Sequence, residues 1–460
     1  MSSSNHLPPV APVANPTIPF WRKEPHELDN IRTTPELPEQ SDIVIIGGGY
    51  AGVSVAYHLV TSQQPERQPP PSITLVEARQ ICSGATGRNG GHLRPDVYET
   101  VALCLERHGI EAAIELARFE VSHIPAVKAA IAKEKIDCDF NLTRCMNVYL
   151  NEEHAERARQ AYEVLRDQGA SYVDDIHYTS QKNAEGVSGV QDAKACLSYT
   201  AGNLWAYKLV MGLLSRVVQS SSVNVQTTTP VTSVTPDGSH HLVHTPRGTI
   251  RASKVVYATN AYTAGLLPEY SKNIVPCKGI CCHITTPENK IPPFLPYTYV
   301  VWNKEGNGDS YLISRPDGSI IVGGAQYSFA QRKEIWHNNV DDSTLIEPAK
   351  HYYDTYMQRT FRGWEDSEAK VQEIWTGIMG YSYDTHPQIG EVPGKPGQFI
   401  CAGFNGHGMP VVFLSGKGIA EMIRDGKQFE EVGLPRIYKT TPARLEAAQT
   451  GPEGGDTFDL

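Results

Sequence analysis

Three glycines near the N-terminus, Gly47, Gly49 and Gly52, have the spacing of a diphosphate-binding turn. The apolar run 43–46 before them predicts a buried parallel strand, and residues 53–60 after them predict an apolar helix. In such a unit the first glycine allows the tight turn, the second lets the backbone approach a diphosphate, and the third lets the helix pack on the strand. The helix N-terminus offers free N–H groups and a positive dipole end to the anion. The predicted contacts are Gly47, Gly49, Tyr50, Ala51 and Gly52.

An acidic residue follows the next predicted strand. Residues 72–76 form this strand, and Glu77 comes 25 positions after Gly52. A carboxylate at this place accepts hydrogen bonds from ribose hydroxyls, which favours an adenosine without a 2′-phosphate. Ala78 adjoins it as a further candidate contact. A glycine-rich turn without a ligand is the alternative, but the order of strand, glycines, helix, strand and acid favours a dinucleotide site.

A second stretch of small residues, 81–95, comes soon after Glu77. Such a stretch makes a poor core and a good backbone cradle for a ligand. The candidate contacts in it are Ser83, Gly84, Ala85, Thr86, Arg88, Asn89, Gly90 and Gly91. His92 and Arg94 come directly after these residues and are candidates to face a substrate, although a structural role for either is the alternative.

The elements that must position these residues alternate along the whole chain of 460 residues. Helical spacing over 102–135 is interrupted near Pro125, strand patterns dominate 274–324, a helix is expected over 348–361, and the segment after Pro435 is expected to be irregular. Buried strands are expected again at 254–258 and 399–402, and a glycine loop and a helix follow the second of them. This order repeats the strand, glycine turn and helix of residues 43–60. We therefore predict an α/β protein in which a Rossmann-like dinucleotide-binding domain is interleaved with an antiparallel β-sheet domain.

The predicted boundaries follow this interleaving. Residues 1–40 form an extended arm, and residues 431–460 form a C-terminal tail. The dinucleotide-binding domain takes residues 41–100, 196–270 and 371–430, and the substrate domain takes 101–195 and 271–370.

The composition excludes several classes of function. A net charge of −10 argues against a nucleic-acid partner, and the longest apolar stretches are too short to span a membrane. Nine scattered cysteines and no secretory signal core in residues 1–40 predict free thiols and a cytoplasmic location. No metal site is predicted. The cluster Cys277, Cys281, Cys282 and His283 lacks paired C-x-x-C elements and lies in an expected strand, and His240, His241 and His244 are expected to be exposed.

Four motifs in register resemble the D-amino-acid oxidase family of flavoproteins, which includes glycine oxidase, sarcosine oxidase and γ-glutamylputrescine oxidase. They are the glycine turn, Gly84–Gly91, Ala258–Ala261 and Ala402–Gly408, and the resemblance covers about residues 40–430. It implies FAD as the cofactor, bound by the residues above and also by Val231, Ala258, Thr259, Asn260, Gly380, Gly403, Asn405, Gly406, His407 and Gly408. His407 would contact the flavin or hydrogen-bond within its loop. Tyr381 would form an aromatic wall that orients an amine, or pack in the core.

The resemblance implies an FAD-dependent enzyme that oxidises a C–N bond of a primary or secondary amine to an imine by hydride transfer, with O₂ as acceptor and H₂O₂ as product. Sarcosine oxidase carries a carboxylate-binding lysine where this chain has Pro410, which favours a larger amine over a plain α-amino acid. It also carries a lysine over the flavin in the strand that corresponds to 319–322, where this chain has none, so a dehydrogenase with another acceptor is the alternative. A flavin-binding protein without turnover is a third possibility. We expect non-covalent FAD, with Cys82 and His92 as the residues that could form a link.

Overall fold

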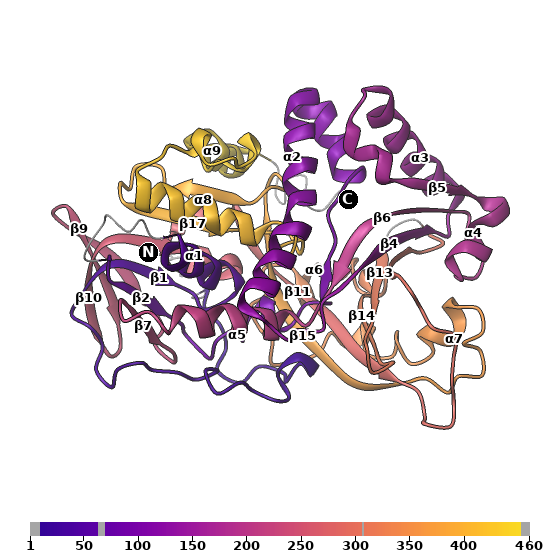
Figure 1. The fold of residues 1–460 in the computed structure, drawn as a ribbon, viewed down its shortest axis with the longest axis horizontal. Coiled ribbons are helices and arrows are strands. Elements are labelled where there is room, and N and C mark those ends of the chain that lie inside the picture. The colour runs from indigo at the N-terminus through magenta and orange to yellow at the C-terminus, as the bar shows by residue number, and fades with distance from the viewer. Residues whose placement is uncertain (1–9, 63–69, 306–307, 452–460) are drawn as a thin grey trace, which may run out of the picture.

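The computed structural model describes residues 10–62, 70–305 and 308–451, and within them the chain forms two β-sheets that lie side by side (Figure 1). Parts of the predicted arm and tail, residues 1–9 and 452–460, lie outside the described residues. One sheet carries the glycine turn, and the other contributes the opposite wall of the candidate site. In the described part of the chain, no helix combines the length and the apolar character that crossing a membrane requires.

The first sheet is mostly parallel, with the order β16-β17-β10-β1-β2-β7 and β8 and β9 added beside β10. Residues 43–46 of β1 are at most 5% exposed, because both faces of the sheet are covered. The parallel run from β17 to β7 brings the carboxyl ends of these strands to one edge. The strands are β1 (Gln40–Ile46), β2 (Ile73–Val76), β7 (Val223–Gln226), β8 (Ser233–Asp237), β9 (His240–Thr245), β10 (Gly248–Tyr257), β16 (Gln388–Glu391) and β17 (Gln398–Ala402).

Helices cover both faces of this sheet. On one face α1 (Tyr50–Thr61) packs between α5 (Ala206–Val217) and α8 (Val412–Asp425). On the other face, Leu445 of α9 (Pro442–Thr450) packs against the cluster that contains Val44 and Ile46. The irregular tail expected after Pro435 is therefore wrong at α9, whose start is capped by the Thr441 hydroxyl and followed by a proline, both good helix-start signals.

The second sheet has the order β15-β11-β14-β13-β12-β4-β6-β3, with β5 beside β6. Every pair in it is antiparallel except β4 and β12. The strands are β3 (His92–Leu93), β4 (Asn141–Tyr149), β5 (His177–Ser180), β6 (Ala195–Asn203), β11 (Ile274–Thr285), β12 (Thr298–Trp302), β13 (Asp309–Ser314), β14 (Ile320–Gly324) and β15 (Lys370–Ser382). The remaining helices are α2 (Glu99–Glu134), α3 (Glu152–Asp167), α4 (Gln181–Ser188), α6 (Lys333–Trp336) and α7 (Tyr356–Thr360). The predicted fold class, a Rossmann-like domain interleaved with an antiparallel sheet, is confirmed.

Two predicted helices differ in the structure. The long helix α2 continues through Pro125, and its backbone leaves the helical region at Gly109 instead, where φ is +81°. A proline costs one helical hydrogen bond, which α2 tolerates because it packs along α5 and α8. The helix expected over 348–361 is wrong, since only α7 and a short 3-10 turn form there.

Three strands belong to a different sheet from the one their predicted segment suggests. β3, β6 and β15 overlap the predicted dinucleotide-binding segments 41–100, 196–270 and 371–430, but all three pair in the second sheet. β15 is 13 residues long, and it carries the second sheet to the edge of the first.

Candidate active site

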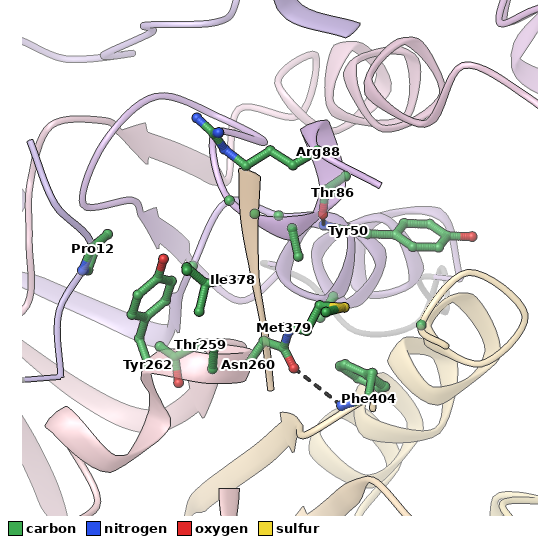
Figure 2. A pocket seen from close by; sticks show the side chains of 18 of the residues that line it. Pro12, Tyr50, Thr86, Arg88, Thr259, Asn260, Tyr262, Ile378, Met379 and Phe404 are labelled. Atoms are coloured by element: carbon green, nitrogen blue, oxygen red, sulfur yellow. Dashed lines mark hydrogen bonds between the residues drawn. The ribbon is translucent and has the colours of Figure 1, made fainter. Parts of the chain in front are cut away.

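A cavity of about 570 Å³ lies where the two sheets meet. One side is formed by residues that follow β1, β2 and β10, and the other by residues of β11, β13 and β15. Figure 2 shows lining residues from the loop after β2 (Thr86, Arg88), from the segment after β10 (Thr259, Asn260) and from β15 (Ile378, Met379). A cavity of this size at the carboxyl edge of an open α/β sheet is typical of a cofactor site.

Most of the residues predicted from the sequence line this cavity. They are Gly47, Gly49, Tyr50, Ala51, Glu77, Ala78, Ser83, Gly84, Ala85, Thr86, Arg88, Asn89, Gly90, His92, Arg94, Val231, Ala258, Thr259, Asn260, Gly406, His407 and Gly408. The predicted residues that are not among the lining residues are Gly52, Gly91, Gly380, Tyr381, Gly403 and Asn405. The assignment of these residues to cofactor binding stays a prediction.

The glycine turn has the geometry that its sequence implies. A Cβ at Gly52 would overlap the carbonyl oxygen of Gly47, so only glycine lets α1 pack this closely on β1. At the start of α1 the N–H of Tyr50 donates to the Thr86 hydroxyl at 2.9 Å. Because that hydroxyl accepts this bond, its own hydrogen can be donated to an anion in the cavity.

Glu77 lies at the end of β2 and is held by two backbone hydrogen bonds. Its carboxylate accepts from the N–H of Gly48 at 2.7 Å and from the N–H of Arg79 at 2.8 Å. Burial raises its pKa, although both bonds act in the opposite direction. These contacts fix the carboxylate in the cavity wall, where its remaining lone pairs can accept hydrogen bonds from ribose hydroxyls.

A buried ion cluster joins the second glycine stretch to the substrate domain. Asp342, which is 0% exposed, accepts two bonds of 3.0 Å from the Arg79 guanidinium and lies 3.4 Å from Nε of Arg88. Burial lowers the pKa of Arg88 to about 10. Both arginines line the cavity and share one carboxylate, so the site carries positive charge that suits a diphosphate.

The second sheet supplies an aromatic and polar wall that sequence analysis missed. The Tyr311 ring lies edge-on to His92, with 5.6 Å between ring centroids, and its hydroxyl lies 3.3 Å from the Cys281 thiol. A Cβ at Gly90 would collide with the Tyr311 ring, so this glycine serves the wall of the cavity. The alternation of apolar and polar residues along a strand indicates which face of the sheet a side chain occupies, but not which residues lie beside it. Sequence spacing therefore did not single out Tyr311.

His92 and Arg94 lie next to this wall and face the same cavity. Burial and the nearby charge of Arg94 lower the pKa of His92 to about 3, so the imidazole is neutral. Arg94 donates through Nη1 to the hydroxyl of Tyr199 at 3.0 Å. The pair thus offers one neutral and one cationic group to a substrate.

His407 is fixed by a residue that is distant in sequence. Its Nε2 lies 2.8 Å from the carboxylate of Glu120 on α2, which also accepts the N–H of Asp96 at 2.6 Å. Because a carboxylate only accepts, Nε2 carries a proton in this contact, which fixes the orientation of the ring. Glu120 is 4% exposed and was not a candidate, since one acidic residue on a long helix carries no distinctive spacing.

The loop 403–408 is held by two asparagines. Asn260 accepts from the N–H groups of Gly403 at 3.0 Å and Phe404 at 3.3 Å, as the dashed line in Figure 2 marks for Phe404. Asn405 accepts from the N–H of Ser382 at 2.7 Å. The Tyr381 hydroxyl lies 3.2 Å from the position that a Cβ of Gly406 would take. Asn405 and Tyr381 therefore support this loop from behind the cavity.

The residues present fit FAD, which the sequence motifs imply. The start of α1 and the Thr86 hydroxyl provide donors for a diphosphate, and Glu77 provides acceptors for a ribose. Arg79 and Arg88 add mainly positive charge, because their N–H groups are already donated to the protein. All nine cysteines are free and buried, and burial raises the pKa of the Cys82 thiol. Among the described residues, no group of three or more His, Cys, Asp or Glu side chains has an arrangement that could hold a metal ion.

Comparison with known proteins gives a consistent result. The pattern of the family described as FAD dependent oxidoreductase (DAO) matches residues 42–422. The chain is 24% identical over 402 residues to γ-glutamylputrescine oxidoreductase of Escherichia coli (strain K12), covering 85% of each chain. It is 22% identical over 391 residues to glycine oxidase of Geobacillus kaustophilus, covering 83% of this chain and 92% of that protein. The crystal structure of glycine oxidase from that organism superposes with a TM-score of 0.70 at 19% identity, over 88% of this chain and 99% of that one.

Proposed function

Because the chain belongs to the DAO family of FAD dependent oxidoreductases, we propose that it oxidises a C–N bond of a primary or secondary amine to an imine. The observation that carries this proposal is the cavity in which the predicted dinucleotide cradle meets a wall containing His92, Arg94, Tyr311 and His407. Related proteins named for γ-glutamylputrescine and for glycine support a C–N bond as the target.

When bound, FAD supplies the acceptor for the hydride that leaves the carbon next to the amine nitrogen. The residues of this chain bind and orient the amine. The neutral His92 imidazole adds no positive charge beside the nitrogen, which favours the neutral amine that this chemistry needs. Glu120 holds the His407 ring through Nε2, so the ring keeps a fixed place in the cavity wall and can orient the amine. The resulting imine is released to water, which hydrolyses it to a carbonyl compound and an amine.

The substrate we propose is larger than a plain α-amino acid. Pro410 lines the cavity in place of a carboxylate-binding lysine. The lining cations on the described residues are arginines: Arg79, Arg88 and Arg94. Arg79 and Arg88 belong to the ion cluster with Asp342, whereas Arg94 lies outside that cluster and donates to Tyr199 of the second sheet.

For the acceptor we propose O₂, with H₂O₂ as product. A dehydrogenase that passes electrons to another acceptor is the second candidate, favoured by the absence of a lysine among the described residues that line the cavity. A panel of diamines, N-alkylated amines and amino acids, assayed for carbonyl product, tests the reaction class. Equal formation of carbonyl product and H₂O₂ supports the oxidase. Carbonyl product that forms only with an added dye supports the dehydrogenase, and no product from any amine contradicts both.

A further inference from the structure

The N-terminal arm reaches the candidate active site itself. Val10, Ala11 and Pro12 line the cavity, although they precede β1 by about thirty residues and lie outside the family match at 42–422. Figure 2 shows Pro12 across from Tyr262 at the edge of the cavity. The common family core therefore does not account for this part of the wall.

The arm crosses the edge of the first sheet where strands end. Its first contact is at Gly265, the last residue of the 3-10 helix after β10, where a Cβ would overlap the carbonyl oxygen of Val10. Its next contact is beyond β2, where Arg79 donates to the carbonyl oxygen of Val13 at 3.1 Å. Since β1 lies between β10 and β2, the segment 10–13 spans the carboxyl ends of all three strands. This edge is where an open α/β sheet binds its dinucleotide.

The arm is anchored on its far side by the second glycine stretch and the substrate domain. Thr17 donates its N–H to the carbonyl oxygen of Asp342 at 2.7 Å. Its own carbonyl oxygen accepts from Arg88 at 2.6 Å, and its hydroxyl accepts from Arg88 at 3.0 Å. Trp21 is 0% exposed and donates through Nε1 to the carbonyl oxygen of Asn89 at 2.5 Å. The segment 10–13 is thus held at both ends by residues that also form the cavity.

We propose that residues Val10–Pro12 form a strap over the adenosine half of bound FAD, so that the cofactor leaves only after the arm has left the cavity. The proposal rests on FAD as the cofactor and not on the identity of the amine. Its consequence is kinetic, because displacement of a covering segment mainly changes the rate of release.

The test measures release of FAD from the reconstituted holoprotein, followed by the recovery of flavin fluorescence after dilution into a scavenger of free flavin. A chain that begins at Pro16 keeps Thr17 and lacks the strap, and we expect it to release FAD about tenfold faster or more. Gly265→Ala in the full chain adds a methyl group that pushes Val10 away, and we expect faster release there too. In the shortened chain Gly265→Ala is expected to change nothing, because its clash partner is gone.

The control is Ile18→Ala, which truncates a side chain that is 74% exposed beside Thr17 and is expected to leave release unchanged. Equal release from full and shortened chains would overturn the strap. An effect of Gly265→Ala that is the same in both chains would also overturn it, since the methyl group would then act on the cofactor directly. If the shortened chain fails to fold, the full chain still tests the proposal. An unchanged rate of FAD release in full-length Gly265→Ala would then refute it. The release experiment contains no amine, so a negative result for the strap says nothing against the proposed amine oxidation.

Discussion

Replacing Asp342 by asparagine removes the one negative charge between two buried arginines. Asp342 is 0% exposed, and its carboxylate lies 3.0 Å from both Nη atoms of Arg79 and 3.4 Å from Nε of Arg88. Asparagine keeps the shape but carries no charge, so two guanidinium groups remain close together away from bulk water. This substitution therefore isolates the charge from the packing.

The burial of the Asp342 cluster sets the size of the expected loss in the free energy of unfolding. Removing one partner of a buried ion pair costs about 3–5 kcal/mol, because an uncompensated charge is left in the interior. A surface pair gives the comparison: Asp237 and Arg251 lie 2.7 Å apart with side chains 43% and 40% exposed. Such an exposed pair contributes about 0–1 kcal/mol. In the binding mode that we propose, FAD brings its diphosphate close to the same two arginines, so bound cofactor is expected to reduce the loss for Asp342→Asn.

Urea unfolding of apoprotein and holoprotein measures these losses. Unfolding is followed by the fluorescence of the six tryptophans, one of which, Trp375, donates to the carbonyl oxygen of Arg88. We expect Asp342→Asn to lower the apparent free energy of unfolding of the apoprotein by about 3–5 kcal/mol and that of the holoprotein by less. Asp237→Asn is expected to lower either by at most about 1 kcal/mol. Equal small losses for both variants would show that Asp342 does not balance the two arginines, and a loss that FAD does not reduce would show that the diphosphate lies elsewhere.

Three other outcomes are expected. Glu120→Gln keeps one acceptor but loses the charge that holds His407, so flavin reduction by amine should slow by about tenfold or more. Glu120→Ala should slow it further, and the His407 ring signals in NMR should broaden in both; unchanged rates and signals would show that Glu120 is not a positioning residue. Burial lowers the pKa of His58 and His92 to about 3 and of His123 to about 4. Because unfolded imidazoles titrate near about 6.5, stability is complete above that pH and should fall by about 1.4 kcal/mol per pH unit for each histidine as the pH decreases toward 4. Urea midpoints that do not change over this range would contradict neutral burial, and His58→Phe should reduce the slope. Since burial raises the pKa of the Cys82 thiol and keeps it protonated, acid precipitation should leave the flavin in the supernatant. Flavin that stays with the pellet would show a covalent link.

The parts of the fold that the sequence predicted are those whose signals are local. β1, the glycine turn and α1 occupy about twenty consecutive residues, and each residue type in them meets a backbone requirement of its own neighbours. The loop 403–408 was found for the same reason. Gly52 was correctly singled out, although it packs α1 onto β1 and does not line the cavity.

The parts that were missed depend on partners distant in the chain. Glu120 and His407 are 287 positions apart, and Arg79 and Asp342 are 263 apart, so no spacing marks either pair. Tyr311 reaches the cavity only because β13 pairs with β14 and brings its ring against Gly90 and Gly323. At Pro125 a local rule failed, because packing of α2 outweighed the lost hydrogen bond.

The proposed amine oxidation is tested by the absorption spectrum of the FAD-reconstituted protein under anaerobic conditions, recorded before and after addition of each amine in the panel. We expect a bound flavin spectrum that at least one primary or secondary amine bleaches, without a nicotinamide. A flavin that no amine bleaches but NADPH does, or a protein that takes up no FAD, would rule out this function.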